Sequence, residues 1–458
     1  METDTITAIA TPAGKGAISV IRVSGDRAFT TVEDFFDGKK AVQDMKPNST
    51  AVGLFKPDKS QSAFIDQVIL TKYVKPRSYT GEDLIEISCH GSVYIVQEIL
   101  NLLLSGGIRL AEAGEFTKRA FLNGKMDLTQ AESVADIINA QTQKSLEYAQ
   151  AQANGSLYSD LAAIREILKK HLIMLEIELD FSDEDVEKQD RSQIMEGLNR
   201  LEEEMNRLVS TFHFGKLIRE GMHLVLTGKP NVGKSSILNR FLNEDRAIVS
   251  EIPGTTRDTI EESLTIDGYL FKISDTAGLR SSQDRLEISG VERTKKQIQM
   301  ADFILFVIDG HKKLTVEDYE SLSAVRQLSR HKKALLINKA DLKSADIDPD
   351  FKTSFDRCVA VSARTGMGFE ALRKLLVEEI ENDQVQHSAV INRVRHLDVL
   401  KRTQQYIDHA RESLTRGFSA EFIAFDIRAA LNTVGELIGE VSSNDILNEI
   451  FSAFCIGK

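Results

Sequence analysis

The chain has 458 residues, of which 42% are hydrophobic and 28% are charged, and its formal net charge is −12. This length is enough for about three domains, and the balance of residue types is that of a globular protein. The negative charge argues against a protein that coats nucleic acid by charge alone, so any contact with RNA would be local or helped by a partner.

Cysteine usage and apolar runs exclude further classes. Cys89, Cys358 and Cys455 have no Cys-x-x-Cys spacing and are odd in number, so the sequence predicts neither a disulfide framework nor a zinc site. The N-terminus is acidic, and no apolar run approaches the roughly 18 residues that a membrane helix needs. We therefore expect a cytoplasmic protein without a membrane segment, in which Cys358 belongs to the core.

Residues 1–118 alternate strand and helix signals and predict a compact α/β domain. A helix over 93–104 should end before Gly106 and Gly107. Strand-like stretches cover residues 5–10, 17–23, 66–74 and 83–89.

Residues 119–219 predict a helical domain. The stretch Thr129-Gln-Ala-Glu132 predicts a capping box at the start of a helix. Apolar stripes predict further helices over 161–179 and 193–208. The acidic run over 180–187 lacks the spacing of a calcium loop, and we interpret it as a solvated turn.

The stretch Gly228 to Ser235, Gly-Lys-Pro-Asn-Val-Gly-Lys-Ser, follows a strand over 223–227 and precedes an apolar helical stripe over 235–243. It matches the P-loop, in which backbone N–H groups and a lysine bind phosphate oxygens and a hydroxyl binds Mg²⁺. The helix N-terminus would also point at the phosphates. The nucleotide-binding candidates here are Asn231, Val232, Gly233, Lys234, Ser235 and Ser236.

Two later stretches suit the phosphates and the metal. In Gly254-Thr-Thr-Arg-Asp258, the hydroxyls of Thr255 and Thr256 could reach Mg²⁺ or the terminal phosphate, and we assign Thr256 to Mg²⁺ together with Ser235. In Asp275-Thr-Ala-Gly278, after a strand over 269–274, Asp275 would lie near the metal and the Gly278 N–H near the γ-phosphate.

Two further stretches suit guanine. Asn338-Lys-Ala-Asp341 follows a strand over 334–337, and a carboxylate at Asp341 can accept from two donors that guanine presents and adenine does not. Ser362-Ala363, after a strand over 358–361, would offer N–H groups to the guanine oxygen. The candidates are Asn338, Lys339, Asp341, Ser362 and Ala363.

All five motifs occur in order, so residues 220–380 resemble the GTPase domain of the translation-factor class. Asp267-Gly268 predicts a hairpin, which would make one strand of an otherwise parallel sheet antiparallel. Leu279 stands where Ras-like enzymes carry the glutamine that orients water, so catalysis must come from elsewhere.

The domain resembles the potassium-dependent GTPases of the TrmE-Era-EngA-like family, whose marker is a P-loop asparagine, here Asn231. That side chain, with carbonyl groups of the loop at Ser250, Ile252 and Thr255, could hold K⁺ against the phosphates. A cation there would replace an arginine finger, an effect of ~10³ to 10⁵ in rate, or roughly 4 to 7 kcal/mol of barrier. The resemblance also assigns Glu287 to the attacking water. The alternatives are an ordinary loop residue for Asn231 and a solvated carboxylate for Glu287.

Three further stretches resemble the tRNA modification GTPases of the MnmE (TrmE) family, and the resemblance covers essentially the whole chain. They are Asp4 to Gly25, Gly114 to Leu128 and the terminal Phe454-Cys-Ile-Gly-Lys458. Membership implies an N-terminal domain with the folate-binding fold of aminomethyltransferases, which dimerises and binds 5-formyl- or 5,10-methylene-tetrahydrofolate. It implies that a heterotetramer with the flavoprotein MnmG (GidA) installs an aminomethyl or carboxymethylaminomethyl group at C5 of the tRNA wobble uridine. GTP hydrolysis would be stimulated by potassium and by pairing of the G domains of a homodimer.

The resemblance also implies residues for the second site. Arg22, Glu82 and Lys125 become candidates for binding folate, although each could equally be a surface ion pair or solvated side chain. Cys455, otherwise a packing residue, would lie near the folate and act in the modification. Ala113 and Lys15 stand where the family often has a proline and an arginine, respectively.

The expected fold is multidomain, α/β plus all-α. It has an N-terminal folate-binding and dimerisation domain (1–118), a discontinuous helical domain (119–219 and 381–458) and an inserted Ras-like G domain with a mixed, mostly parallel sheet (220–380). A GTP-dependent switch in ribosome assembly, without covalent chemistry, is the main alternative function. A folate-dependent methyltransferase with a vestigial GTPase is disfavoured, because every guanine and phosphate motif is intact.

Overall fold

The structure is a computed structural model that describes residues 4–180, 191–245, 261–275, 295–328, 331–382, 389–440 and 444–458. By its internal contacts the chain divides into two compact units. One contains Met1–Ala135 with Leu431–Lys458, and the other contains Asp136–Ala430. The finer division into four segments stays a prediction.

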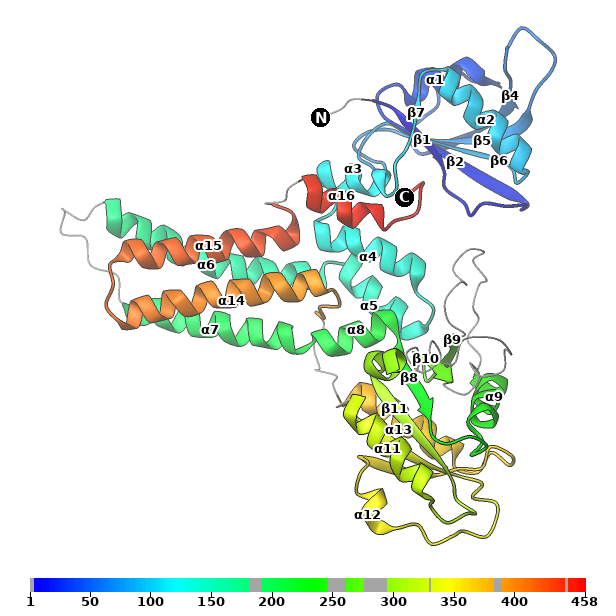
Figure 1. Cartoon of the computed structure of the whole chain (residues 1–458). Coiled ribbons are helices and arrows are strands. Elements are labelled where there is room, and N and C mark those ends of the chain that lie inside the picture. The colour runs from blue at the N-terminus through cyan, green and yellow to red at the C-terminus, as the bar shows by residue number, and fades with distance from the viewer. Residues whose placement is uncertain are drawn as a thin grey trace. The chain divides into compact units, whose positions relative to one another are not determined.

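A seven-stranded sheet forms the body of the first unit, in the order β3-β4-β5-β6-β2-β1-β7 (Figure 1). Neighbouring strands are antiparallel except for β1 and β7, which are parallel. The strands are β1 (Ile6–Ile9), β2 (Ile18–Ser24), β3 (Phe36–Gly38), β4 (Ser49–Phe55), β5 (Asp66–Tyr73), β6 (Leu84–His90) and β7 (Arg109–Leu110).

Helices α1 (Ala28–Phe35) and α2 (Val93–Ser105) share a core with this sheet. Along β5, side chains alternate between buried and more exposed, which is the pattern of a strand with one covered face. Ile99 and Leu103 of α2 are fully buried with Ile85 and Ile87 of β6. The predicted α/β character is confirmed, and the four predicted strands and the helix all exist.

The first unit also contains α3 (Glu115–Leu122), most of α4 (Leu128–Asn139) and α16 (Asn444–Ser452). The capping box expected at Thr129 is wrong. The carboxylate of Asp127 accepts from the N–H groups of Thr129 (2.8 Å) and Gln130 (3.1 Å), and the Gln130 side chain accepts from the N–H of Asp127 (3.0 Å). The box therefore begins two residues earlier, and Thr129 is buried inside the helix.

The second unit contains the long helices and the shorter α5 and α8. They are α5 (Gln143–Ala153), α6 (Ser156–Asp180), α7 (Arg191–Ser210), α8 (Phe212–Glu220), α14 (Val394–Thr415) and most of α15 (Ala420–Ile438). One stripe of α7 is buried at helical spacing, Ile194, Leu198, Leu201, Met205 and Leu208. Helix α14 packs along α7 (Figure 1), so helical segments that precede and follow the G domain in sequence do pack together.

A six-stranded sheet in the order β13-β12-β11-β8-β10-β9 forms the G domain (Figure 1). It is parallel except for the β9–β10 pair, as the Asp267-Gly268 signal predicted. Both turn residues have positive φ, 49° and 82°, which suits a two-residue hairpin turn. The strands are β8 (Met222–Thr227), β9 (Glu261–Ile266), β10 (Tyr269–Asp275), β11 (Phe303–Asp309), β12 (Lys333–Asn338) and β13 (Arg357–Ala360).

The helices of this domain are α9 (Lys234–Asp245), α11 (Val316–Leu328), α12 (Pro349–Lys352) and α13 (Phe369–Glu381). Every residue of β11 is buried, as expected for a central parallel strand covered on both faces. The prediction that Cys358 belongs to the core is wrong, because it lies on the edge strand β13 and is exposed. Within the described ranges, no helix is both long and apolar enough to cross a membrane.

Candidate functional site

The P-loop connects the buried strand β8 to helix α9 (Figure 1). Three of its residues have positive φ: Gly228 (134°) at its start, and Asn231 (64°) and Gly233 (99°) further along. A Cβ at Gly233 would lie 2.2 Å from the Nδ2 atom of Asn338, so only glycine fits there. Val232, between them, is buried and anchors the loop.

Lys234 begins α9 and is almost fully buried. Its ammonium donates to the carbonyl oxygens of Gly228 (2.8 Å) and Lys229 (2.9 Å). Ser235 and Ser236 follow in the first turn and are exposed. The N-terminus of a helix favours an anion, so a buried cation and two exposed hydroxyls lie where a phosphate would bind.

Asn338 joins the P-loop to the guanine motifs. Its Nδ2 donates to the carbonyl oxygen of Val232 (2.8 Å), and its Oδ1 accepts from the N–H of Ala363 (3.2 Å). These two bonds bring together three stretches that the sequence analysis placed in one nucleotide site.

Lys339 adds a fourth element to the site. It has φ 66°, and its Nζ lies 2.6 Å from Oδ2 of Asp309 at the end of β11. Burial alone would raise the pKa of Asp309, but bonds from Lys339 and the N–H of His311 hold the pKa below its ordinary value. The sequence analysis missed Asp309, although its place after a buried strand at the carboxyl edge of the sheet could have indicated it.

Asp341 is exposed, and its Oδ1 accepts from the Ser362 hydroxyl at 2.6 Å. That hydrogen bond lowers the pKa of the Asp341 carboxyl, so it is an ionised acceptor at neutral pH. Ser362 is in turn fixed by a bond from the N–H of Thr365 to its hydroxyl. An accepting carboxylate beside the P-loop is the group that guanine recognition requires.

Several of the predicted site residues lie outside the described ranges. They include Glu287, the predicted catalytic residue, and all of the proposed K⁺ ligands except Asn231. Asp275 is the last residue of β10, where its backbone pairs with Leu226 of β8, the strand that leads into the P-loop. The undescribed residues are Ser250, Ile252, Thr255, Thr256, Gly278, Leu279 and Glu287.

The folate candidates lie in the first unit, around the stretch from Ser78 to Glu82. Arg22 on β2 forms an ion pair with Glu86 on β6 (2.7 Å), and its guanidinium lies over the rings of Tyr79 (5.2 Å) and Phe116 (5.6 Å). Its Nη1 also donates to the carbonyl oxygen of Gly457 (3.4 Å).

Glu82 and Lys125 border the same stretch. Glu82 accepts from the Ser24 hydroxyl (2.8 Å) and forms an ion pair with Arg119 (3.2 Å). The Lys125 ammonium is exposed and donates to the carbonyl oxygen of Pro76 (3.0 Å). The structure thus brings all three candidates around one stretch, although Arg22 and Glu82 have different ionic partners.

The chain's last residues fold onto this region. Ile456 forms a β-bridge with Ala113, and the carbonyl oxygen of Cys455 accepts from the N–H of Gly114 (3.4 Å). Gly457 has φ 98°, and a Cβ there would lie 2.2 Å from the carbonyl oxygen of Ile9. The tail is therefore seated closely on the domain, with the side chain of Cys455 exposed.

Lys458 and Tyr79 are residues of this region that the sequence analysis missed. The Lys458 ammonium lies 5.9 Å from the Tyr79 ring, on which Arg22 also rests. Burial and the nearby Arg22 lower the pKa of Lys458, and burial raises the pKa of the Tyr79 hydroxyl. Two cations around one aromatic ring suit an anionic, planar ligand. No local pattern reveals this arrangement, because the Arg22–Gly457 contact spans 435 residues.

Two protein-family models match the chain. The model described as "MnmE helical domain" matches residues 128–455, and the one described as "GTP-binding protein TrmE N-terminus" matches residues 5–125.

Curated relatives match over the full length. A protein of Cytophaga hutchinsonii is 39% identical and covers 100% of this chain and 98% of its own. One of Syntrophus aciditrophicus is 41% identical with 99% of each chain covered, and one of Aquifex aeolicus is 39% identical with the same coverage. Each carries the name "tRNA modification GTPase MnmE".

Proposed function

Because the chain belongs to the MnmE family of tRNA modification GTPases, we propose that it hydrolyses GTP and that this hydrolysis serves the modification of tRNA. The observation that carries the proposal is the pair of bonds from Asn338, which hold the P-loop and the guanine motifs as one site. A phosphate cradle and an ionised guanine acceptor in one site select GTP.

In the nucleotide site, Lys234 would exchange its bonds to the loop carbonyls for the phosphates of GTP. Ser235 and Thr256 would hold Mg²⁺, with Asp275 nearby, and the ion would neutralise charge on the phosphates. Asp341 would accept from guanine, and Ser362 and Ala363 would offer N–H groups to its oxygen. The polar groups present in the described part of the site fit this ligand, because they supply both a cation for phosphate and an acceptor for guanine.

Hydrolysis needs a group that orients water and a positive charge that an arginine finger would otherwise supply. We assign the first role to Glu287 and the second to K⁺ held by Asn231, Ser250, Ile252 and Thr255. Asn231 has a left-handed backbone, a conformation that asparagine adopts more readily than most residues, so the residue type suits its place in the loop.

In the first unit we propose a site for a tetrahydrofolate one-carbon donor. Arg22 and Lys458 would bind the anionic tail, and the Tyr79 ring would contact a flat ring system. Glu82 and Lys125 would complete the site on the other side of the stretch from Ser78 to Glu82. Cys455, exposed beside these groups, would act in the modification. Pairing of two chains would build the homodimer.

The expected product is a wobble uridine carrying an aminomethyl or carboxymethylaminomethyl group at C5, made together with the flavoprotein MnmG and released in the cytoplasm. The net charge of −12 supports a partner that grips most of the tRNA.

The experiment is mass analysis of tRNA nucleosides from cells that lack this chain, from the same cells with the chain restored, and from cells given Lys234→Ala. We expect the modified wobble uridine only where the unaltered chain is present. Unchanged modification in the deletion strain, together with a defect in ribosomal subunits, would instead support the assembly switch.

A further inference from the structure

A single carboxylate holds both ends of the G domain. Asp136, in the last turns of α4, accepts from Nε of Arg219 (3.2 Å) and from Nη2 of Arg393 (2.8 Å). Its other oxygen accepts from Nδ2 of Asn392 at 3.3 Å. Only 10% of the Asp136 side chain is exposed, so these charges interact with little screening.

The two arginines mark the entry and the exit of the inserted domain. Arg219 lies in the last turn of α8, just before β8, and Arg393 is the N-cap residue of α14, just after the domain. The chain segments that enter and leave the inserted domain are in contact with each other. The Thr211 hydroxyl accepts from the N–H of Ile391 (3.1 Å), and a Cβ at Gly215 would lie 2.3 Å from the carbonyl oxygen of Ile391.

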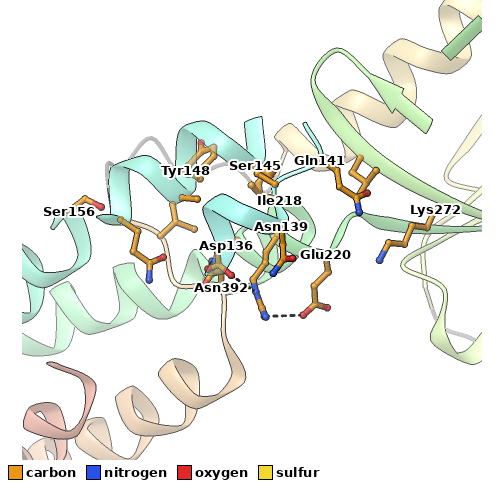
Figure 2. Close-up of a pocket in the computed structure, with 17 residues that line it drawn as sticks. Asp136, Asn139, Gln141, Ser145, Tyr148, Ser156, Ile218, Glu220, Lys272 and Asn392 are labelled. Atoms are coloured by element: carbon orange, nitrogen blue, oxygen red, sulfur yellow. Dashed lines mark hydrogen bonds and ion pairs between the residues drawn. The ribbon is translucent and has the colours of Figure 1, made fainter. Parts of the chain in front are cut away.

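A cavity of about 350 Å³ adjoins this cluster. Figure 2 shows Asp136, Asn392 and Glu220 gathered at the cavity, with Lys272 also on its lining. Lys272 belongs to β10, the strand that ends in Asp275 of the phosphate motif. The cavity therefore lies between the end of α4 and β10, the strand that ends at Asp275.

Arg219 has a second acceptor within reach. Its Nη1 lies 3.3 Å from Oε1 of Glu220, nearly the same separation as from Asp136. Arg219 thus contacts two carboxylates at once beside open space, so its contact with Asp136 can be exchanged for a fuller contact with Glu220 if the ends of the domain shift.

We propose that Asp136 is a positioning residue that couples the nucleotide state of the G domain to the reaction on tRNA, an inference that rests on the proposed function. The first residues of α4 give the coupling a direction. Leu128 and Ala131 pack with Phe451 and Phe454, immediately before Cys455. Movement of the G domain against its two anchored ends is thereby transmitted to α4, the helix that packs against the base of the tail.

The test compares Asp136→Asn with Asp160→Asn. Asp160 forms a comparable, partly buried ion pair with Arg207 (2.8 Å), which joins α6 to α7. With Asp136→Asn we expect the GTP turnover number of the purified chain to stay within about 2-fold, while wobble-uridine modification in complemented cells falls at least ~10-fold, a typical coupling between sites. Asp160→Asn should change neither. A parallel loss of both activities in Asp136→Asn, or modification at the wild-type level, overturns the proposal.

A physical readout separates this proposal from the proposed function. Hydrogen exchange of α4 amides is measured in the full chain with GDP and with a non-hydrolysable GTP analogue. Exchange should depend on the nucleotide in the wild type and in Asp160→Asn, and not in Asp136→Asn. Exchange that is independent of the nucleotide in the wild type overturns the coupling even if tRNA is modified. Nucleotide-dependent exchange without tRNA modification by the wild type overturns only the proposed function.

Two further variants serve if Asp136→Asn does not fold. Arg219→Gln and Arg393→Gln each release one end of the G domain and leave the other held. We expect each to reduce the nucleotide response of α4 while hydrolysis continues, and an unchanged response in both overturns the proposal.

Discussion

The side-chain amide of Asn338 forms hydrogen bonds with the backbone of two neighbouring loops. It donates to the carbonyl oxygen of Val232 and accepts from the N–H of Ala363. A buried polar group left without its partner costs more than an ordinary hydrogen bond is worth. Asn338 is therefore a structural residue of the nucleotide site as well as part of a recognition motif.

Asn338→Ala should lower the free energy of unfolding by about 1 to 3 kcal/mol, because two backbone groups lose their partner. GTP affinity should fall as well, since the P-loop is then less firmly positioned. Denaturant unfolding and nucleotide titration measure the two effects. Asn101→Ala, which removes an exposed amide bonded only to Gln97, is the control and should leave both nearly unchanged.

Cys455 is exposed in a tail whose backbone is held by Gly114 and Ala113. Cys455→Ser should abolish wobble-uridine modification and leave GTP turnover within about 2-fold, because serine fits the same backbone but lacks a thiolate nucleophile. Nucleoside mass analysis and a phosphate-release assay follow the two activities. Loss of both would mean that the tail has a structural role, and Cys358→Ser is the matched control.

At the scale of helices and strands, the sequence predicted those elements whose signals are local. The P-loop, the β9–β10 hairpin and the amphipathic α7 depend on residues within one or two turns of chain. The start of α4 was placed two residues late, because Thr129 and Asp127 both have capping side chains and only burial distinguishes them. In the first unit, strands β3, β4 and β7 and helices α1 and α3 were missed.

The residues of the candidate sites also divide into those that a local motif predicts and those that only the tertiary structure brings together. The candidate guanine and phosphate residues in the described part of the chain come from contiguous motifs, and Asn338 joins three of these motifs in the structure. Tyr79, Lys458 and Asp309 were not predicted as site residues, because their roles arise from contacts between distant segments. Cys358 was misplaced because an edge strand and a central strand have similar short apolar patterns.

The start of α3 depends on a network of charges. Glu115 forms ion pairs with Arg109 of β7 (2.7 Å) and with Arg119 (2.9 Å). Burial alone would raise the pKa of Glu115, but the bonds from Arg109, the N–H of Glu112 and Arg119 together lower the pKa below its ordinary value of 4.5.

Because the folded-state pKa is depressed, the stabilisation is fully present above about pH 4.5 and is lost as the pH falls through the lower folded-state value. Glu115→Gln should therefore be less stable than the wild type at pH 7, and the difference should shrink as the pH is lowered below 4.5. Thermal unfolding at a series of pH values measures this. A difference that is independent of pH would show that the ion pairs do not contribute. Glu112→Gln is the control.

At the scale of the whole molecule, the two candidate sites lie in different units. The described nucleotide residues all lie in Asp136–Ala430, whereas the folate candidates and Cys455 lie in the other unit. A chain built in this way can lose one activity and keep the other.

Potassium should raise GTP turnover well above the level in sodium at equal ionic strength, by up to the ~10³-fold or more attributed to a positive charge at the phosphates. The expectation follows from two residues. Leu279 stands where Ras-like enzymes have a glutamine, and position 231 of the P-loop is an asparagine. Phosphate release in matched potassium and sodium buffers measures the effect. Equal rates would remove the cation role from Asn231, and Asn231→Ala should make the two rates equal.

The positions of the three cysteines make the protein suitable for spectroscopic labelling. Cys89 is buried, and burial raises the pKa of its thiol to about 11, so it should resist maleimide reagents at neutral pH. In Cys455→Ser, Cys358 is then the one exposed thiol, at the edge of the G-domain sheet. A nitroxide there would place one spin on each G domain, and the distance between two spins would report whether the G domains of a dimer approach each other during the GTP cycle.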